Sequence, residues 1–151
     1  VFDLMYDDYS PILKEMKERM KKVSSFSSEN IVATVIDDIC KSRQYGMLSF
    51  KFNYPLRKII SPDTIKDNED RNFILSPGTH CDFVIFNDLN KRIQLIVEVD
   101  GKQHEKEIQK KRDQRKDRII NFFAIDMLRI KTTDVNVKEK IESILSSKKC
   151  V

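Results

Sequence analysis

Two short apolar segments, 81–86 and 93–99, constrain the fold more than any other feature of this sequence. Both are rich in Val, Ile, Leu and Phe, and polar, turn-forming residues lie beside them, which is typical of buried β-strands. The segment NDLNK between them supplies the Asn and Asp that favour a hairpin turn. We therefore expect the two segments to be antiparallel neighbours in one sheet.

The remaining segments alternate between helical and strand patterns. Apolar residues at helical spacing predict helices at about 10–22, 29–41, 106–123 and 135–145. Shorter apolar segments predict strands at 47–54 and 125–130. The polar stretch 61–78 indicates a loop with only a brief ordered segment near Phe73. After the first helix the order is helix, three strands, helix, strand, helix, which predicts a layered α/β domain.

Length and composition exclude several classes of protein. A chain of 151 residues has the size of one domain with one buried core, which we assign to 25–151 with a helical extension at 1–24. With 40% hydrophobic and 34% charged residues it is neither disordered nor a membrane protein, and it has no secretory signal, so a cytoplasmic location is expected. Cys40, Cys81 and Cys150 lack the spacing of a zinc site or a disulfide framework. Val1 in place of an initiator Met indicates a piece of a longer polypeptide.

Positive charge is concentrated in the predicted helix 106–123. The whole chain has a net charge of +4, and residues 106–118 alone hold seven Lys or Arg against three Asp or Glu. The side of this helix that is expected to be buried carries Ile108, Ile119, Ile120 and Phe123. The basic stripe could contact phosphate, although a solvated helix surface is the simpler interpretation for most of these charges.

Acidic residues interrupt or end the two apolar strands. Side chains two apart share a face of a strand, so Glu98 and Asp100 lie together at the end of the second strand. Asp82 interrupts the first strand, and hairpin pairing would bring its carboxylate toward the other two. Clustered carboxylates resist ionisation unless a cation neutralises them, and such oxygen ligands favour Mg²⁺ or Mn²⁺. For each acid alone, a turn cap or a solvated strand end is the competing interpretation.

A histidine and a cation from the following helix could complete this cluster. Gly101 permits a sharp exit from the strand and would bring His104 back toward the acids, where it could act as a base or orient water. On the helix, Lys116 is the first choice for a cation directed at the acids, and Arg112 is the second. His80, just before its strand, is expected to be structural.

The segments CDFVIF, LIVEVDGKQH, RDQRKDRI and MLRI resemble motifs of the PD-(D/E)XK nuclease superfamily, and they occur in the same order. The resemblance covers about residues 29–130 and is closest to very-short-patch repair endonucleases and to domains at the C-termini of superfamily-one DNA helicases. It implies a restriction-endonuclease-like αβββαβ core, a mixed central sheet flanked by helices. It also implies that Asp82, Glu98 and the main-chain carbonyl of Val99 bind magnesium.

The chain departs from the superfamily pattern at one position. The usual lysine two residues after the glutamate is replaced by Asp100, so the resemblance assigns the missing role to His104 or Lys116. Glu29 resembles the acid that some members contribute from their first core helix.

The sequence therefore predicts a Mg²⁺- or Mn²⁺-dependent deoxyribonuclease whose partners are DNA and a helicase motor in the same polypeptide. Its predicted catalytic residues are Asp82, Glu98, Asp100, His104 and Lys116, and its predicted DNA contacts are Lys111, Arg112 and Arg115. One alternative is a catalytically inactive nucleic-acid-binding module of the same fold. Another is a structural or protein-interaction domain whose helix charges pair only with one another.

Overall fold

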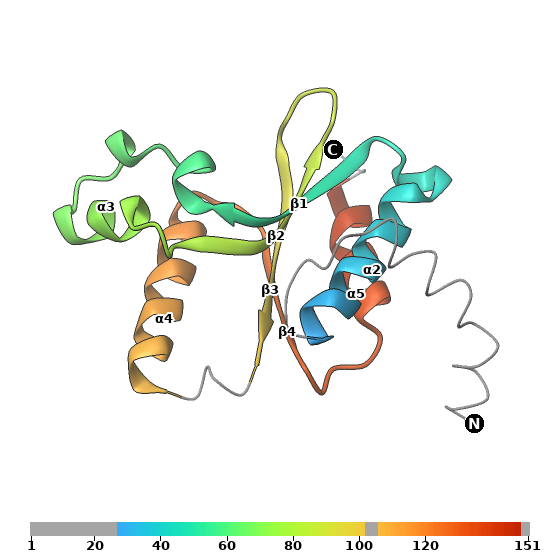
Figure 1. Cartoon of the computed structure of the whole chain (residues 1–151). Coiled ribbons are helices and arrows are strands. Elements are labelled where there is room, and N and C mark those ends of the chain that lie inside the picture. Colours follow the sequence, from blue (N-terminus) through green and yellow to red (C-terminus); the bar gives the residue numbers. More distant parts are fainter. Residues whose placement is uncertain (1–26, 102–105, 149–151) are drawn as a thin grey trace.

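The computed structural model describes residues 27–101 and 106–148, and its elements follow the predicted order (Figure 1). The four described helices are α2 (Ser27–Lys41), α3 (Asn68–Leu75), α4 (Glu107–Phe122) and α5 (Val137–Ser147). The four strands are β1 (Leu48–Pro55), β2 (His80–Asn87), β3 (Ile93–Asp100) and β4 (Met127–Lys131). Short 3-10 helices occupy Arg43–Tyr45, Leu56–Lys58 and Pro62–Thr64. The predicted α/β fold is confirmed, while the extension 1–24 and Cys150 lie outside the described residues.

The strands form one mixed sheet in the order β1-β2-β3-β4. The pairs β1–β2 and β2–β3 are antiparallel, and β3–β4 is parallel. Helix α4 makes the crossover between β3 and β4, because parallel neighbours cannot be joined by a tight turn. The hairpin is closed at Asn87, whose N–H donates to the Arg92 carbonyl and whose side chain accepts from the N–H of Leu89, each at 2.9 Å. The predicted hairpin is therefore confirmed.

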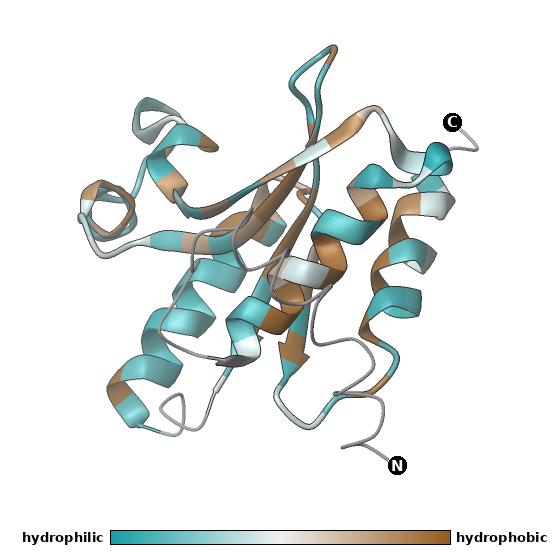
Figure 2. Cartoon of the chain, turned by 45° about the vertical axis from the view of Figure 1, so that its right-hand side comes forward, coloured by the Kyte–Doolittle hydropathy of each residue, from teal (hydrophilic) through white to brown (hydrophobic). Residues whose placement is uncertain are grey.

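Apolar side chains pack on both faces of the sheet. On one face α2, α5 and the 3-10 segment Arg43–Tyr45 cover the sheet, and on the other lie α3, α4 and the two later 3-10 segments (Figure 1). The apolar sides of α2 and α5 are turned inward, whereas the surface of α4 is largely hydrophilic (Figure 2). Phe83, Leu95 and Val97 belong to the first cluster, and Val84 and Ile96 to the second. The predicted single core is thus divided in two, because alternate residues of a strand point to opposite faces.

Only the C-terminal half of α4 packs on the sheet. Ile119 and Ile120 are buried, but Ile108, which was expected on the same side, is 77% exposed. Of the described residues in this segment, Ile119, Ile120 and Phe123 pack on the second core cluster, whereas Ile108 belongs to neither cluster. The prediction for Ile108 is therefore wrong, and the polar N-terminal half of α4 lies beside the ends of β2 and β3.

The stretch 61–78 is more ordered than its polar sequence predicted. Asp67 caps α3, and its Oδ2 accepts from the N–H of Asp70 at 2.9 Å. Asp70 in turn accepts two hydrogen bonds from Arg118 of α4, at 2.7 and 2.9 Å. These contacts fix α3 against α4, which a pattern of local polarity cannot show. None of the described helices is long and apolar enough to cross a lipid bilayer.

Candidate active site

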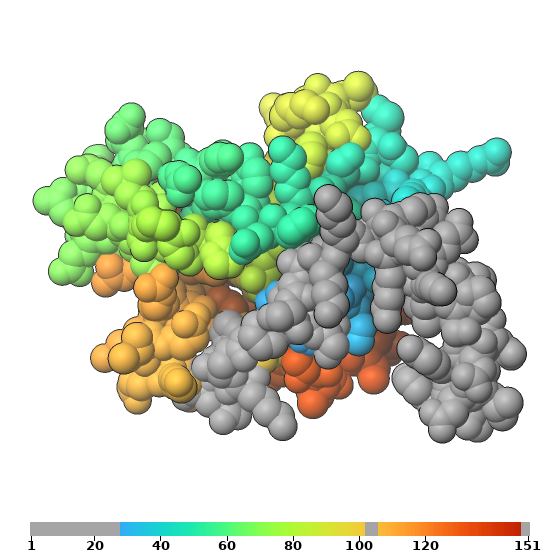
Figure 3. Space-filling view, viewed as in Figure 1, coloured from blue at the N-terminus to red at the C-terminus, as the bar shows by residue number. Residues whose placement is uncertain are grey.

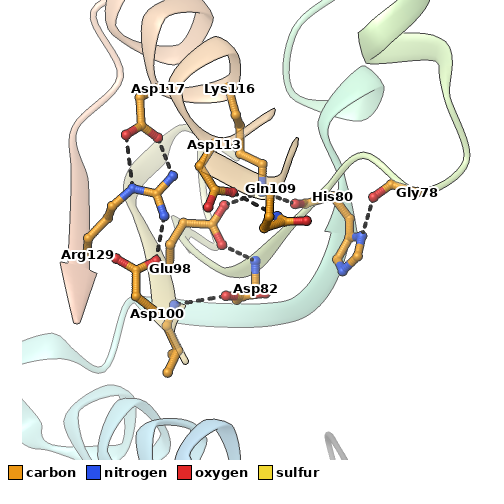
Figure 4. Close-up of polar contacts among 11 residues, drawn as sticks. Gly78, His80, Asp82, Glu98, Asp100, Gln109, Asp113, Lys116, Asp117 and Arg129 are labelled. Carbon is orange, nitrogen blue, oxygen red and sulfur yellow. Dashed lines mark hydrogen bonds and ion pairs between the residues drawn. The ribbon is translucent and has the colours of Figure 1, made fainter. Parts of the chain in front are cut away.

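The main-chain pairing between β2 and β3 ends where the acidic residues begin. The last paired residues are Phe83 and Val97, and beyond them the strands diverge (Figure 1). The N–H of Val99 donates to Oδ2 of Asp82 at 2.8 Å, and the N–H of Asp82 donates to Oε2 of Glu98 at 3.1 Å. Each carboxylate accepts a hydrogen bond that a backbone carbonyl would accept in a continuous ladder. The two acids therefore meet at the opening between the strands (Figure 4).

Lys116 of α4 reaches the same opening. Its Nζ is 2.8 Å from Oε1 of Glu98 and 2.8 Å from the carbonyl oxygen of His80. Glu98 is 2% exposed, so its charge requires a partner at this depth. Ile119 and Ile120, one turn after Lys116, anchor the helix in the core and direct Lys116 to the acids. The predicted choice of Lys116 over Arg112 as the cation nearest the acids agrees with this geometry.

The electrostatics of the site favour a protonated Asp82 when no cation is bound. Burial and the adjacent charge of Glu98 raise the pKa of Asp82 to about 8. Burial disfavours the charged form of Lys116, but its contact with Glu98 outweighs burial and raises the pKa of Lys116 above its ordinary value. The site therefore holds one ion pair and one further carboxyl group that a cation would help to ionise.

The backbone of Val99 contributes a further oxygen. The N–H of Ile96 donates to the Asp126 carbonyl at 2.9 Å, so alternate residues of β3 direct their backbone groups toward the β4 side. The N–H and C=O of one strand residue point to the same side, so those of Val99 face β2. Because its N–H binds Asp82, the carbonyl of Val99 is also directed into the opening.

Asp100 does not join the other two acids as predicted. Its Oδ1 accepts from Nη1 of Arg129 at 2.7 Å, and Arg129 also binds Asp117 of α4. Strand β4 places Arg129 opposite Glu98 in the parallel register, which gives Asp100 a cation as its neighbour. In 27–101 and 106–148, no three His, Cys, Asp or Glu side chains are grouped as metal ligands. The predicted convergence of three carboxylates is therefore reduced to two.

A pocket of about 410 Å³ opens in front of Asp82 and Glu98. Its other lining residues are Glu29, Phe73, Gly78, Thr79, His80, Gln109, Arg112, Asp113, Lys116 and Arg129. Glu29, the acid that the resemblance assigns to the first core helix, contributes to this pocket from the first turn of α2. Its charge adds to burial and to Glu98 in raising the pKa of Asp82. The buried hydroxyl of Thr79 has no hydrogen-bond partner among the described residues.

His80 lies in this pocket, although the sequence interpretation left it as structural. It precedes Asp82 by two residues and so shares its face of β2, a relation that the strand period alone could have revealed. Its Nδ1 lies 3.1 Å from the Gly78 carbonyl. Because a carbonyl can only accept, Nδ1 is the donor in this contact. His104 lies outside the described residues.

The three cations predicted to bind DNA have different surroundings. Arg112 lines the pocket, and its guanidinium carbon is 5.5 Å from the ring centroid of Phe73. Arg115 is 6.0 Å from the same ring and forms an ion pair with Glu69 at 3.3 Å. Lys111 is exposed and does not line the pocket. Phe73 was not predicted as a site residue, because only the packing of α3 on α4 brings it there.

Comparison with known proteins gives one family relationship. A family model described as a protein of unknown function matches residues 52–148, well over half of the chain. The match includes every residue of the pocket except Glu29. No curated protein and no solved structure matches the chain.

Proposed function

The chain belongs to the DUF2726 family, and from the geometry of its site we propose that it is a metal-dependent nuclease domain that hydrolyses DNA phosphodiester bonds. One observation carries the proposal: Asp82 and Glu98 meet where adjacent strands diverge, and the Lys116 ammonium lies 2.8 Å from Glu98. Two acids from neighbouring strands with a lysine beside them are what the resemblance to PD-(D/E)XK nucleases implies.

The donor set suits Mg²⁺ or Mn²⁺. Two carboxylates and the Val99 carbonyl are hard oxygen ligands, and Mg²⁺ commonly binds one or two carboxylates while it keeps several waters. A third acid is therefore not required. The raised pKa of Asp82 adds support, because a cation beside this carboxyl group would remove the cost of ionising it. When bound, the cation would supply positive charge against the phosphate oxygens of the transition state.

Lys116 would take the role of the superfamily's usual lysine, which this chain replaces with Asp100. It follows Glu98 by 18 residues rather than two, yet its ammonium contacts the Glu98 carboxylate directly. Two of its three N–H donors go to Glu98 and His80, and the third can be directed at a phosphate oxygen. Arg129 lines the pocket and is bound by Asp100. Asp100 would therefore act through Arg129, as a positioning residue.

The test is a cleavage assay with the whole chain. Supercoiled plasmid and single-stranded circular DNA are incubated with Mg²⁺ or Mn²⁺, and the parent is compared with Asp82→Asn, Glu98→Gln and Lys116→Met. We expect metal-dependent cutting that falls by about 100-fold or more in each variant. The matched control is Asp63→Asn, which neutralises an exposed carboxylate outside the pocket and should cut like the parent. Cutting that survives both acid variants would refute this site.

A second candidate function is favoured by the position two residues after Glu98. Asp100 stands there and is paired with Arg129, so a nucleic-acid-binding module that has lost catalysis would fit the same contacts. Such a module would retain DNA in a steeply salt-dependent manner without cutting it in any divalent metal. The role of His104, the helicase motor and the cytoplasmic location stay predictions.

A further inference from the structure

The site pocket is larger than a hydrated cation needs. Six water-sized ligands of roughly 30 Å³ each fill about 180 Å³, whereas the pocket holds about 410 Å³. More than half of the space is therefore left for a group attached to the reacting phosphate.

Phe73 and Arg112 supply the part of the pocket wall that is suited to a planar group. The Phe73 ring is half-buried and packs on the second core cluster, and the guanidinium of Arg112 lies over the ring at 5.5 Å from its centroid. The bidentate pair of Arg118 and Asp70 fixes α3 to α4, so the ring is held in place. The space-filling view shows α3 and α4 on the same face of the molecule (Figure 3).

An unsatisfied polar group lies in the same pocket. Thr79 is 2% exposed, and its hydroxyl has no partner among the described residues. A buried hydroxyl without a hydrogen bond is costly. Thr79 lines the pocket, and the wall next to the acids combines an aromatic ring with a guanidinium plane.

We propose that this pocket binds an unpaired nucleobase between Phe73 and Arg112, so that the substrate is single-stranded or locally unpaired nucleic acid. Aromatic rings and guanidinium groups both stack on bases. A base between the two planes needs roughly 7 Å, two contacts of about 3.5 Å, so the exposed Arg112 side chain would move outward by roughly 2 Å. A base within a duplex is already stacked and paired, and cannot enter such a pocket without leaving the helix. The inference rests on the proposed function only in that Asp82 and Glu98 would act on the phosphodiester attached to the bound base.

The test measures binding rather than cutting. Fluorescence anisotropy is recorded for a labelled 12-nucleotide single strand, for its blunt duplex, and for single strands with one abasic residue at each position in turn. Calcium replaces magnesium, and a parallel series contains chelator. We expect the single strand to bind about ten-fold tighter than the duplex, and one abasic position to weaken binding about ten-fold. An abasic residue keeps the phosphate charge, so this loss reports the base alone.

Variants then locate the base. Phe73→Ala should remove the abasic effect, Phe73→Tyr should restore it, and Arg112→Lys, which keeps the charge but not the plane, should reduce it. The control is Phe122→Ala, which removes a phenylalanine that is 81% exposed and outside this pocket. The abasic series on the unaltered protein needs no variant to fold.

Three results would overturn the inference: a duplex that binds as tightly as the single strand, the absence of any abasic effect, or an abasic effect that persists unchanged in Phe73→Ala. Cutting of duplex DNA that depends on Asp82 and Glu98 but not on Phe73 would refute the base-binding inference and still support the proposed nuclease function. A Phe73-dependent base effect without cutting in any divalent metal would support the inference and assign the pocket to a binding module.

Discussion

Replacing Asp82 with asparagine should make the metal-free protein more stable above neutral pH. Burial and the charge of Glu98 raise the pKa of Asp82 from 3.8 to about 8. Between these values the folded protein keeps a proton that the unfolded chain has released, so its free energy of unfolding falls as pH rises. The stabilisation from the protonated carboxyl group is fully present below about pH 4 and is lost as pH rises through about 8. Asparagine has no such titration, and its side-chain oxygen can still accept from Val99.

The expected change in the free energy of unfolding follows from the number of protons bound by the folded and unfolded states. One proton bound only in the folded state changes stability by about 1.4 kcal/mol per pH unit. Between pH 5.5 and 7.5 the parent would lose up to about 3 kcal/mol through Asp82, and because this carboxyl group is partly exposed we expect about 1–2 kcal/mol. The Asp82→Asn variant should show no such loss.

Urea denaturation followed by far-UV circular dichroism suits the measurement, because the chain has no tryptophan. Both proteins are unfolded at pH 5.5 and 7.5 in the presence of chelator, with Asp63→Asn as the control. Parallel changes in stability with pH for the parent and Asp82→Asn would refute the reasoning. Magnesium at ten times its dissociation constant should then stabilise the parent by about 1.4 kcal/mol and leave the variant unchanged.

Arg129→Lys should lower the free energy of unfolding by about 1–3 kcal/mol, because lysine cannot bind Asp117 in the same forked manner; an unchanged urea midpoint would contradict this. The hydrogen bond from Arg118 lowers the pKa of Asp70, so its stabilisation is present above about pH 4 and is lost as pH falls further. Since Arg118 is exposed, Asp70→Asn should remove only about 0.5 kcal/mol of this acid-dependent stability. If thermal melts show the same stability difference between the parent and Asp70→Asn at pH 3 and at pH 6, the pair does not contribute. Burial raises the pKa of Cys81, so iodoacetamide at pH 8 followed by peptide mapping should find this thiol labelled only after unfolding; labelling in the native protein would contradict its burial.

Some of the site could be predicted because its information is local. The alternation of the apolar segments placed Asp82 and Glu98 on strands whose other residues are buried, and the hairpin made those strands neighbours. The helical period of 106–123 placed Lys116 one turn before Ile119, which pointed it toward the sheet. Each of these relations spans a few residues of one element or a single turn.

Other features were decided only when separate elements packed together. Asp100 carries no local sign that it binds Arg129, since that contact follows from the parallel pairing of β3 with β4 across the whole α4 crossover. Ile108 fits the apolar stripe of α4, yet it is exposed, and only the C-terminal part of the helix, at Ile119 and Ile120, packs into a core cluster. Phe73 reaches the pocket through the packing of α3 on α4.

The amino-acid pattern by itself thus determined which residues share a face of a strand or helix, because a side chain's direction relative to its neighbours depends on the backbone period alone. The tertiary structure decided which inward or edge residues share a partner, because ion pairs and pocket walls join segments that are distant along the chain. A contact of that kind depends on register, crossover and helix length together, and no single stretch of sequence contains all three.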